Sequence, residues 1–295
     1  MSPASTEKFL LEQYAGHPAS QLQDLRKALY QSVFGCGHLI TDTAAAEGIR
    51  RETAEAGPCS REIEALDGPW SRVQLGVLAD GLTPETLSRM FARSAAMPHG
   101  DADALQEKLT VLRRLIHSGA LPYSPAEADA ELDDWRKNGF PACHHSDEYR
   151  AAYRPAYRVL HRTYVHLLPL LAAIDRALAE NPRVLLAIEG GAASGKSTLA
   201  DLLTAIYPDT ALFHADDFFL RPEQRTAARY AQPGGNLDRE RLESEILAPI
   251  SRNEVAIYRP FDCHTLSLRE PVTILPGRLN IVEGSYSFHP ELARY

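Results

Sequence analysis

The chain has 295 residues, 44% hydrophobic and 24% charged, which is ordinary for a globular protein and long enough for two domains. Its net charge of −8 carries no basic excess, which argues against a nucleic-acid partner. Four cysteines form no CxxC pair, so neither a disulfide framework nor a zinc ribbon is indicated. No apolar run approaches the roughly 20 residues of a membrane span, and no secretory leader is recognisable. We therefore expect a cytoplasmic protein with no membrane partner.

Residues 1–181 are predicted to form a mainly α-helical domain whose function the sequence does not reveal. Apolar residues recur at helical spacing in 21–33, 83–95 and 103–117. Residues 157–178 are predicted as one long helix that bends at Pro169. No strand-like alternation is sustained in this region.

Two short stretches of this domain carry side chains that bind metals in other proteins. Cys36 and His38 are flanked by glycines, and Cys143 is followed by His144 and His145. Together they could form a metal site. Nothing in their spacing requires one, and solvent-facing or core residues are the commoner explanation.

A row of arginines follows in residues 149–162. Arg150, Arg154, Arg158 and Arg162 recur every four residues among tyrosines. The row could bind a phosphate or another anion. A solvated helix face, with arginine stems packed on tyrosine rings, explains it equally well.

A second domain is expected to begin at Pro182, because Asn181-Pro182 ends the preceding helix. Residues 184–188 are an unbroken apolar run, as expected for a buried strand of a parallel sheet. Residues 199–206 repeat apolar positions at helical spacing until Pro208. The segment between this strand and this helix is therefore a strand-to-helix loop.

That loop fits GxxxxGK[ST], the phosphate-binding pattern, and ATP or GTP is the expected ligand. Its glycines let backbone N–H groups approach phosphate oxygens at a helix N-terminus. Lys196 is expected to reach the β- and γ-phosphates, and Ser197 to ligate Mg²⁺. The predicted nucleotide-binding residues are Gly190, Gly191, Ala192, Ala193, Ser194, Gly195, Lys196, Ser197 and Thr198. The alternative, a chance glycine-rich turn, does not explain the flanking strand and helix.

Residues 210–214 are predicted to form a second strand that delivers Asp216 and Asp217 to the carboxyl edge of the sheet. Ligands bind at that edge in open α/β sheets. One of these aspartates could orient or deprotonate an attacking hydroxyl. The alternative is that both simply begin a turn. Residues 221–235 are predicted to be a mobile loop over the site.

The remaining elements are a helix capped by Asp238, a hairpin with His264 near its tip, and a strand that ends in Glu283. Their predicted ranges are 238–249 for the helix, 255–261 and 266–275 for the hairpin, and 279–282 for the strand. An acidic residue at the end of a strand beside the phosphate loop usually completes the Mg²⁺ shell. Glu283 is therefore a predicted metal ligand.

Five motifs in order resemble the uridine kinase and phosphoribulokinase group of P-loop kinases. They are GGAASGKSTLA, HADDFF, NLDRERLESEIL, YRPFDCHTLS and IVEGSY, and they span roughly residues 184–286. The resemblance implies an α/β P-loop NTPase fold, a parallel sheet flanked by helices, preceded here by the helical domain. Residues 1–180 do not resemble the usual uridine kinase.

The resemblance also implies residue roles. Asp216 corresponds to the general base, Glu283 joins the Mg²⁺ shell, Asp238 contacts hydroxyls of the acceptor, and His264 touches the base of the acceptor. Where the family usually has a tyrosine, two residues before the hairpin phenylalanine, this chain departs from the pattern. The residues there, also predicted to bind the acceptor, are Tyr258 and Arg259. The sequence therefore leaves open whether the acceptor site recognises a pyrimidine.

The expected activity is transfer of the ATP γ-phosphoryl group, with Mg²⁺, to a hydroxyl of a small molecule, most readily a nucleoside such as uridine. Pantothenate or a sugar phosphate is the alternative acceptor, and a nucleotide-dependent switch or ATPase with the helical domain as output is the alternative class. Only 11 residues follow Gly284 (295 − 284), whereas family members continue with arginines that clamp the phosphoryl group. Residues 182–295 are thus expected to be a truncated, poorly active kinase, unless arginines such as Arg154 or Arg158 substitute.

Overall fold

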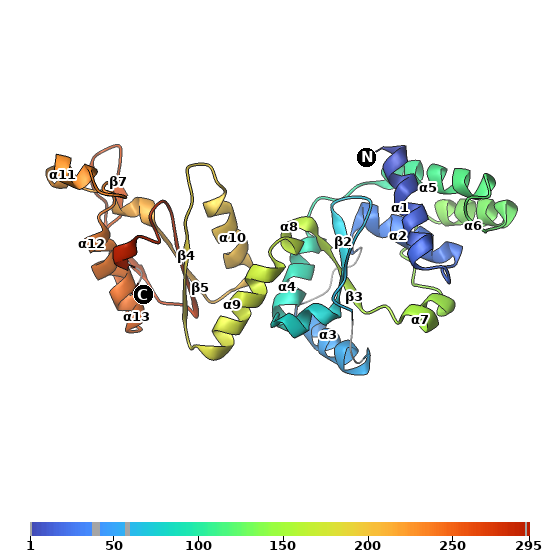
Figure 1. Ribbon diagram of the computed structural model, residues 1–295, viewed down its shortest axis with the longest axis horizontal. Helices are drawn as coiled ribbons and strands as arrows, with labels where there is room; N and C mark the ends of the chain where they lie inside the picture. Colours follow the sequence, from blue (N-terminus) through green and yellow to red (C-terminus); the bar gives the residue numbers. More distant parts are fainter. Residues whose placement is uncertain (1, 37–41, 57–59, 293) are drawn as a thin grey trace. The chain divides into compact units, whose positions relative to one another are not determined.

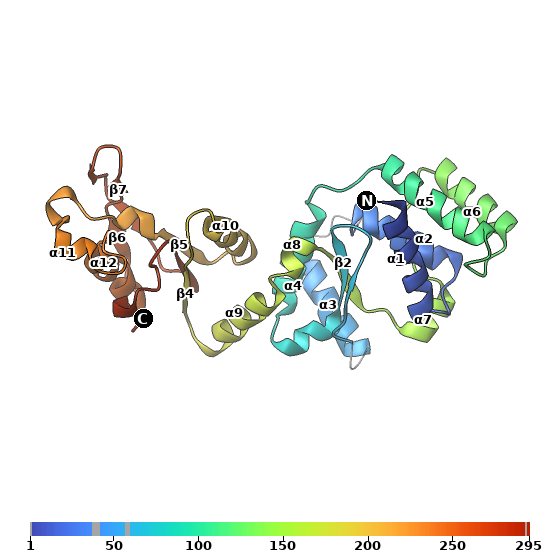
Figure 2. The ribbon, with the colours of Figure 1, turned by 45° about the horizontal axis from the view of Figure 1, so that its top comes forward.

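The computed structural model describes residues 2–36, 42–56, 60–292 and 294–295. The chain divides into two compact units, Met1–Asp175 and Arg176–Tyr295, and the division falls within helix α9, Leu168–Glu180 (Figures 1 and 2). Within the described ranges, every helix is too short or too polar to cross a membrane.

The first unit is built mainly of helices, as its apolar periodicity predicts. Besides α9 they are α1 Pro3–Gly16, α2 Leu22–Phe34, α3 Asp42–Ala56, α4 Pro84–Ala95, α5 Ala102–His117, α6 Pro125–Lys137, α7 Asp147–Tyr153 and α8 Arg162–Val165. The predicted helices in 21–33, 83–95 and 103–117 are confirmed as α2, α4 and α5. Thr83 and Asp101 cap α4 and α5, because the side chain of each accepts a hydrogen bond from the backbone N–H group three residues later. Leu10, Leu29 and Leu112, all fully buried, join α1, α2 and α5 in one core.

A three-stranded antiparallel sheet in this unit corrects two sequence-based predictions. Its strands, in the order β1-β2-β3, are Ile63–Ala65, Trp70–Gln74 and Tyr157–His161. The prediction of one helix over 157–178 is wrong, because its first five residues pair with β2. The row of arginines is likewise not one helix face. Pro155 disfavours helical backbone at Arg154, whose φ is +44°, and the chain turns there from α7 into β3.

The second unit contains a parallel sheet with the order β4-β10-β5. The strands are Val184–Ile188, Leu279–Glu283 and Thr210–His214, which confirms all three predicted strands. The central strand β10 is buried at all five residues. Helix α10, Lys196–Ile206, follows β4 and packs against β10 and β5 through an apolar face that includes Leu203 and Ile206. A parallel sheet with such a strand, loop and helix is compatible with a P-loop NTPase fold.

The rest of this unit largely follows the predicted order. The predicted hairpin is confirmed as two antiparallel pairs, β6 with β9 and β7 with β8. These strands are Ala256–Tyr258, Val272–Ile274, Phe261–Asp262 and Ser267–Leu268. A continuous helical stretch after Asp238 comprises α12 Arg239–Leu242, a π turn Glu243–Leu247 and α13 Ala248–Ser251. Residues 221–235 are not a plain loop, because they contain a 3-10 turn Pro222–Gln224 and α11 Ala227–Tyr230.

Candidate functional site

Three strand ends meet at one edge of the parallel sheet. Glu283, the last residue of β10, is in register with Ile188 of β4 on one side and with His214 of β5 on the other. Because all three strands are parallel, the segments that follow them emerge at the same carboxyl edge. The phosphate loop, the Glu283-Gly284 turn and the segment with Asp216 are therefore neighbours.

The phosphate loop has the backbone that its sequence requires. Gly195 has φ +86° and Ala193 has φ +57°, both in the left-handed region. A Cβ on Gly190 would lie 2.7 Å from Ser194 Oγ, so a larger residue there would require the Ser194 side chain to move. Residues 191–195 are exposed, and so is Thr198 on α10. The loop is thus open to a ligand along its length.

Lys196, the first residue of α10, folds back over this loop. Its Nζ donates a hydrogen bond of 2.8 Å to the carbonyl oxygen of Gly191. A bound phosphate would offer the ammonium group a charged acceptor in place of this neutral carbonyl, and charge-assisted hydrogen bonds are roughly twice as strong. The Lys196 ammonium group therefore needs only a small movement to exchange the Gly191 carbonyl for a phosphate oxygen.

Ser197 and Glu283 bring two oxygen donors together. Ser197 Oγ lies 3.4 Å from Glu283 Oε1, and Glu283 is 7% exposed. A hydroxyl and a carboxylate oxygen are ligands that Mg²⁺ prefers, so the donor set fits this ion. Gly284, with φ +145°, lies so close to Ala215 that a Cβ would be 2.6 Å from the alanine Cβ. The glycine thus lets the end of β10 pack closely against the residue that follows β5.

His214 is a part of the site that sequence reasoning missed. Its Nδ1 lies 2.7 Å from Glu283 Oε1, and the imidazole is about half exposed. The signal was present in the sequence, since His214 ends the strand whose next residues include Asp216. Only the register of β10 with β5 reveals that the histidine faces Glu283.

The two aspartates after β5 lie in different surroundings. Asp216, in the 3-10 turn Ala215–Phe218, is exposed and has no side-chain partner within the described ranges. Asp217 is half-buried and accepts a hydrogen bond of 3.2 Å from the hydroxyl of Tyr258. Burial raises the pKa of Asp217, although Tyr258 opposes this shift. Asp216 is therefore the aspartate that is available to a ligand here.

Asp238 is fully buried, and both of its carboxylate oxygens are engaged within the chain. Oδ1 accepts from the backbone N–H of Arg241 at 3.2 Å, which caps α12, and Oδ2 accepts from the side-chain amide of Gln224 at 2.9 Å. The capping role predicted from sequence is confirmed. A contact with acceptor hydroxyls stays a prediction, and it would require these bonds to rearrange.

The hairpin residues predicted to bind the acceptor have different partners. Arg259 holds the two strands together, since its guanidinium donates to the carbonyl oxygens of Arg269 at 2.7 Å and Leu268 at 3.0 Å. His264 is exposed, and its backbone N–H donates to Asp262 at 2.8 Å. Of the predicted acceptor residues, only Tyr258 is linked to the aspartate pair. The roles of Arg259 and His264 stay predictions.

The predicted alternative metal site in the first unit gains no support. His38 lies outside the described residues, and within those described there is no cluster of three or more potential metal ligands. Cys143 is half-buried, and His145 is buried between Asp24 and Tyr157. Both ring nitrogens of His145 are satisfied, by Asp24 Oδ1 at 2.8 Å and the Tyr157 hydroxyl at 2.6 Å. This histidine therefore holds the core together.

The His145–Asp24 pair predicts that the first unit loses stability in mild acid. Burial lowers the pKa of His145 to about 4, against 6.5 for the unperturbed group. Between these two pH values the unfolded chain binds a proton that the folded chain excludes. The free energy of unfolding therefore decreases as the pH is lowered, by up to about 1.4 kcal/mol per pH unit. Burial would raise the pKa of Asp24, but its hydrogen bonds outweigh burial and lower this pKa to about 2. The stability that Asp24 contributes is therefore lost only when the pH falls below about 3.8, the pKa of the unperturbed group.

Urea unfolding at pH 7 and pH 5 checks this, followed by tryptophan fluorescence, because both tryptophans, Trp70 and Trp135, lie in the first unit. The variant His145→Asn keeps a donor toward Asp24 and cannot take up the proton. We expect its loss of stability between the two pH values to be clearly smaller than that of the wild type. Equal losses would contradict the assignment.

Comparison with known proteins leaves the family open. No protein-family model matches the chain, and no curated protein matches it. Solved structures that match in part include that of a possible uridine kinase from Bacillus stearothermophilus, with 20% sequence identity and a TM-score of 0.33, over 41% of this chain and 76% of that chain. A TM-score this low does not establish a shared fold.

Proposed function

We propose that the second unit is an ATP-dependent phosphotransferase that moves the γ-phosphoryl group to a hydroxyl of a small molecule. The observation that carries this proposal is the meeting of the phosphate loop, Glu283 and Asp216 at one edge of the parallel sheet. A nucleotide phosphate, its metal ion and an acceptor hydroxyl need groups of these three kinds side by side.

Each group has a stated task. The loop N–H groups and Lys196 bind the nucleotide phosphates, and Ser197 with Glu283 would hold Mg²⁺, which neutralises charge on the phosphates when bound. His214 keeps the Glu283 carboxylate oriented through the contact of 2.7 Å between His214 Nδ1 and Glu283 Oε1. Asp216 is proposed to orient the acceptor hydroxyl and take its proton.

The acceptor is proposed to be a nucleoside, and this rests on the sequence motifs shared with uridine kinases. Pantothenate and sugar phosphates remain alternative acceptors, because Arg259 and Tyr258 depart from the family pattern. The aspartate exposed beside the phosphate loop supports a kinase over a nucleotide switch, since a switch needs no base for a second substrate.

The test is a phosphoryl-transfer assay with γ-labelled ATP and Mg²⁺ on the full chain. Uridine, cytidine, pantothenate, ribulose 5-phosphate and no acceptor are compared, with products separated by thin-layer chromatography and identified by mass. We expect label in a nucleoside monophosphate. Label in another acceptor would change the substrate class, and hydrolysis that no acceptor accelerates would support the switch instead.

A further inference from the structure

The first unit contains two adjoining cavities that play no part in the phosphate-loop site. Their volumes are about 600 and 720 Å³, within the usual range of small-molecule sites. Six residues line both cavities: Lys27, Gln31, Glu52, His144, Tyr157 and Arg158. Because these residues are shared, the two cavities lie side by side, and together they are called here the unit 1 cavity.

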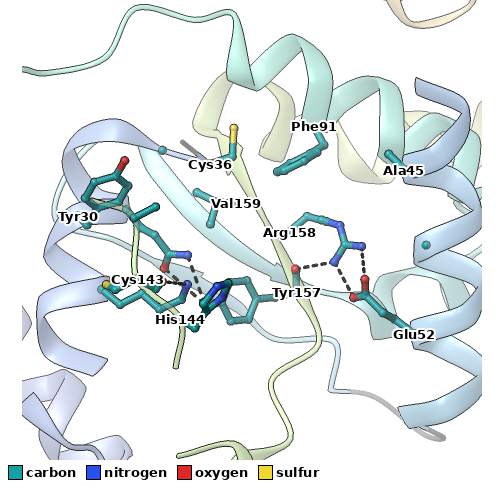
Figure 3. A pocket seen from close by; sticks show the side chains of 15 residues that line it. Tyr30, Cys36, Ala45, Glu52, Phe91, Cys143, His144, Tyr157, Arg158 and Val159 are labelled. Carbon is teal, nitrogen blue, oxygen red and sulfur yellow. Dashed lines mark hydrogen bonds and ion pairs between the residues drawn. The ribbon is translucent and has the colours of Figure 1, made fainter. Parts of the chain in front are cut away.

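One part of the unit 1 cavity, called here its apolar part, has apolar side chains beside the Arg158–Glu52 pair (Figure 3). Phe91 from α4 and Val159 from β3 line it and are 6% and 3% exposed. Tyr30 from α2 and Ala45 from α3 complete this wall. The carbon skeleton of a ligand would be buried here against side chains from four different elements.

The other part of the cavity carries an excess of cations. Arg158 is neutralised by Glu52, through two hydrogen bonds of 2.8 Å each. Arg150 and Arg154 also line the cavity, and both are exposed. Neither guanidinium has a partner within the described parts of the chain, and Glu55 is the one other carboxylate lining this cavity among the described residues.

Lys27 lies between the two parts. Its Nζ donates to the carbonyl oxygen of Cys143 at 2.8 Å, and the side chain is half-buried. Burial lowers the pKa of Lys27, and the nearby positive charges of Arg72 and Arg150 lower it further. A ligand anion beside the Lys27 ammonium group would offset the repulsion between Lys27 and these two arginines.

The turn at Arg154 explains how these arginines gather. Arg150 belongs to α7, Arg154 has left-handed backbone after it, and Arg158 belongs to β3. The reversal brings all three to the unit 1 cavity, whereas Arg162 lines a different one. Three members of the arginine row thus share a cavity although they do not share a helix.

We propose that the unit 1 cavity binds a small phosphate monoester. Its phosphate would lie at Lys27, Arg150 and Arg154, and its carbon skeleton against Phe91 and Val159. A phosphate monoester carries close to two negative charges at neutral pH, which suits three cations better than the single charge of a carboxylate does. Guanidinium groups also match phosphate geometry with paired donors.

The cavity is a binding site and has no activated thiol. Burial raises the pKa of the Cys143 thiol, so the sulfur stays protonated at neutral pH and is a poor nucleophile. The thiol is nonetheless useful as a reporter of occupancy, because Cys143 lines the apolar part of the cavity.

Isothermal titration calorimetry on the full chain tests the ligand class with four probes. Phenyl phosphate offers both the head group and the ring, inorganic phosphate only the head, benzyl alcohol only the ring, and benzoate a carboxylate in place of the phosphate. We expect phenyl phosphate to bind most tightly. Binding of benzoate with equal affinity would overturn the choice of phosphate, and tighter binding of inorganic phosphate would overturn the role of the apolar wall.

Variants and alkylation then locate the site. The double variant Arg150→Gln with Arg154→Gln, at exposed positions, should weaken phenyl phosphate about tenfold or more. Arg136→Gln, at an exposed arginine on α6, should bind as the wild type does. Phenyl phosphate should also slow maleimide modification of Cys143 and leave Cys263 in the second unit unaffected. Unchanged affinity in the double variant, or an unprotected Cys143, would overturn the proposal.

Discussion

The Lys196→Ala variant should lose phosphoryl transfer by about 10²–10³-fold or more, because a charge aimed at the transferring phosphate acts most strongly in the transition state. Nucleotide affinity should fall as well, since the ammonium group also contacts the bound phosphates. Among the residues that the structure describes, the Lys196 side chain makes one hydrogen bond, to the Gly191 carbonyl at 2.8 Å. Its removal should therefore leave the folding stability nearly unchanged.

Calorimetric titration with ATP and Mg²⁺, together with the transfer assay, measures both effects. Lys137→Ala is the matched control, because Lys137 is an exposed lysine on α6 of the other unit. The control should keep full activity and affinity. Wild-type ATP affinity in Lys196→Ala would remove the basis for calling this loop a nucleotide site.

The phosphate loop could be predicted in detail because its signals are local. The apolar run of β4, the glycine at 195 with φ +86° and the apolar face of α10 are all set by residues next to one another in sequence. Such patterns determine backbone conformation before any distant contact forms. The same holds for Asp238, whose role as a helix cap is readable from the sequence.

The features that sequence reasoning missed depend on distant partners. Residues 157–161 have apolar and polar positions that fit a helix, and their strand forms because β2 pairs with it across more than 80 residues. The contact of His214 with Glu283 likewise follows from the pairing of β5 with β10. Tertiary pairing of this kind overrides local propensity and leaves no mark in the local pattern.

The arginine row shows the same limit in functional terms. A spacing of four predicts one helix face, but Pro155 and the turn at Arg154 break the helix. Arg150, Arg154 and Arg158 still lie close together because the chain reverses direction at Arg154. The spacing of four alone does not predict this reversal. The sequence therefore showed the arginines of this cluster but not the cavity that three of them line.

Asp216→Asn should lower phosphoryl transfer by about 10²-fold or more while ATP binding is retained. The substitution preserves shape and hydrogen-bonding reach and removes only the proton acceptor. Asp217→Asn should have a smaller effect, because the amide oxygen can still accept the hydrogen bond from Tyr258 that Asp217 accepts at 3.2 Å. Asp201→Asn, at an exposed position on α10, is the control and should behave as the wild type.

Comparing the two aspartate variants at several pH values tests which carboxylate is the base. Asp216 is exposed and has no side-chain partner in the described ranges, whereas burial raises the pKa of Asp217. With Asp216 as the base, Asp217→Asn should keep the pH profile of the wild type. If Asp217→Asn instead caused the larger loss and abolished the pH dependence, the half-buried carboxylate would be the base. The motif assignment would then be wrong by one residue.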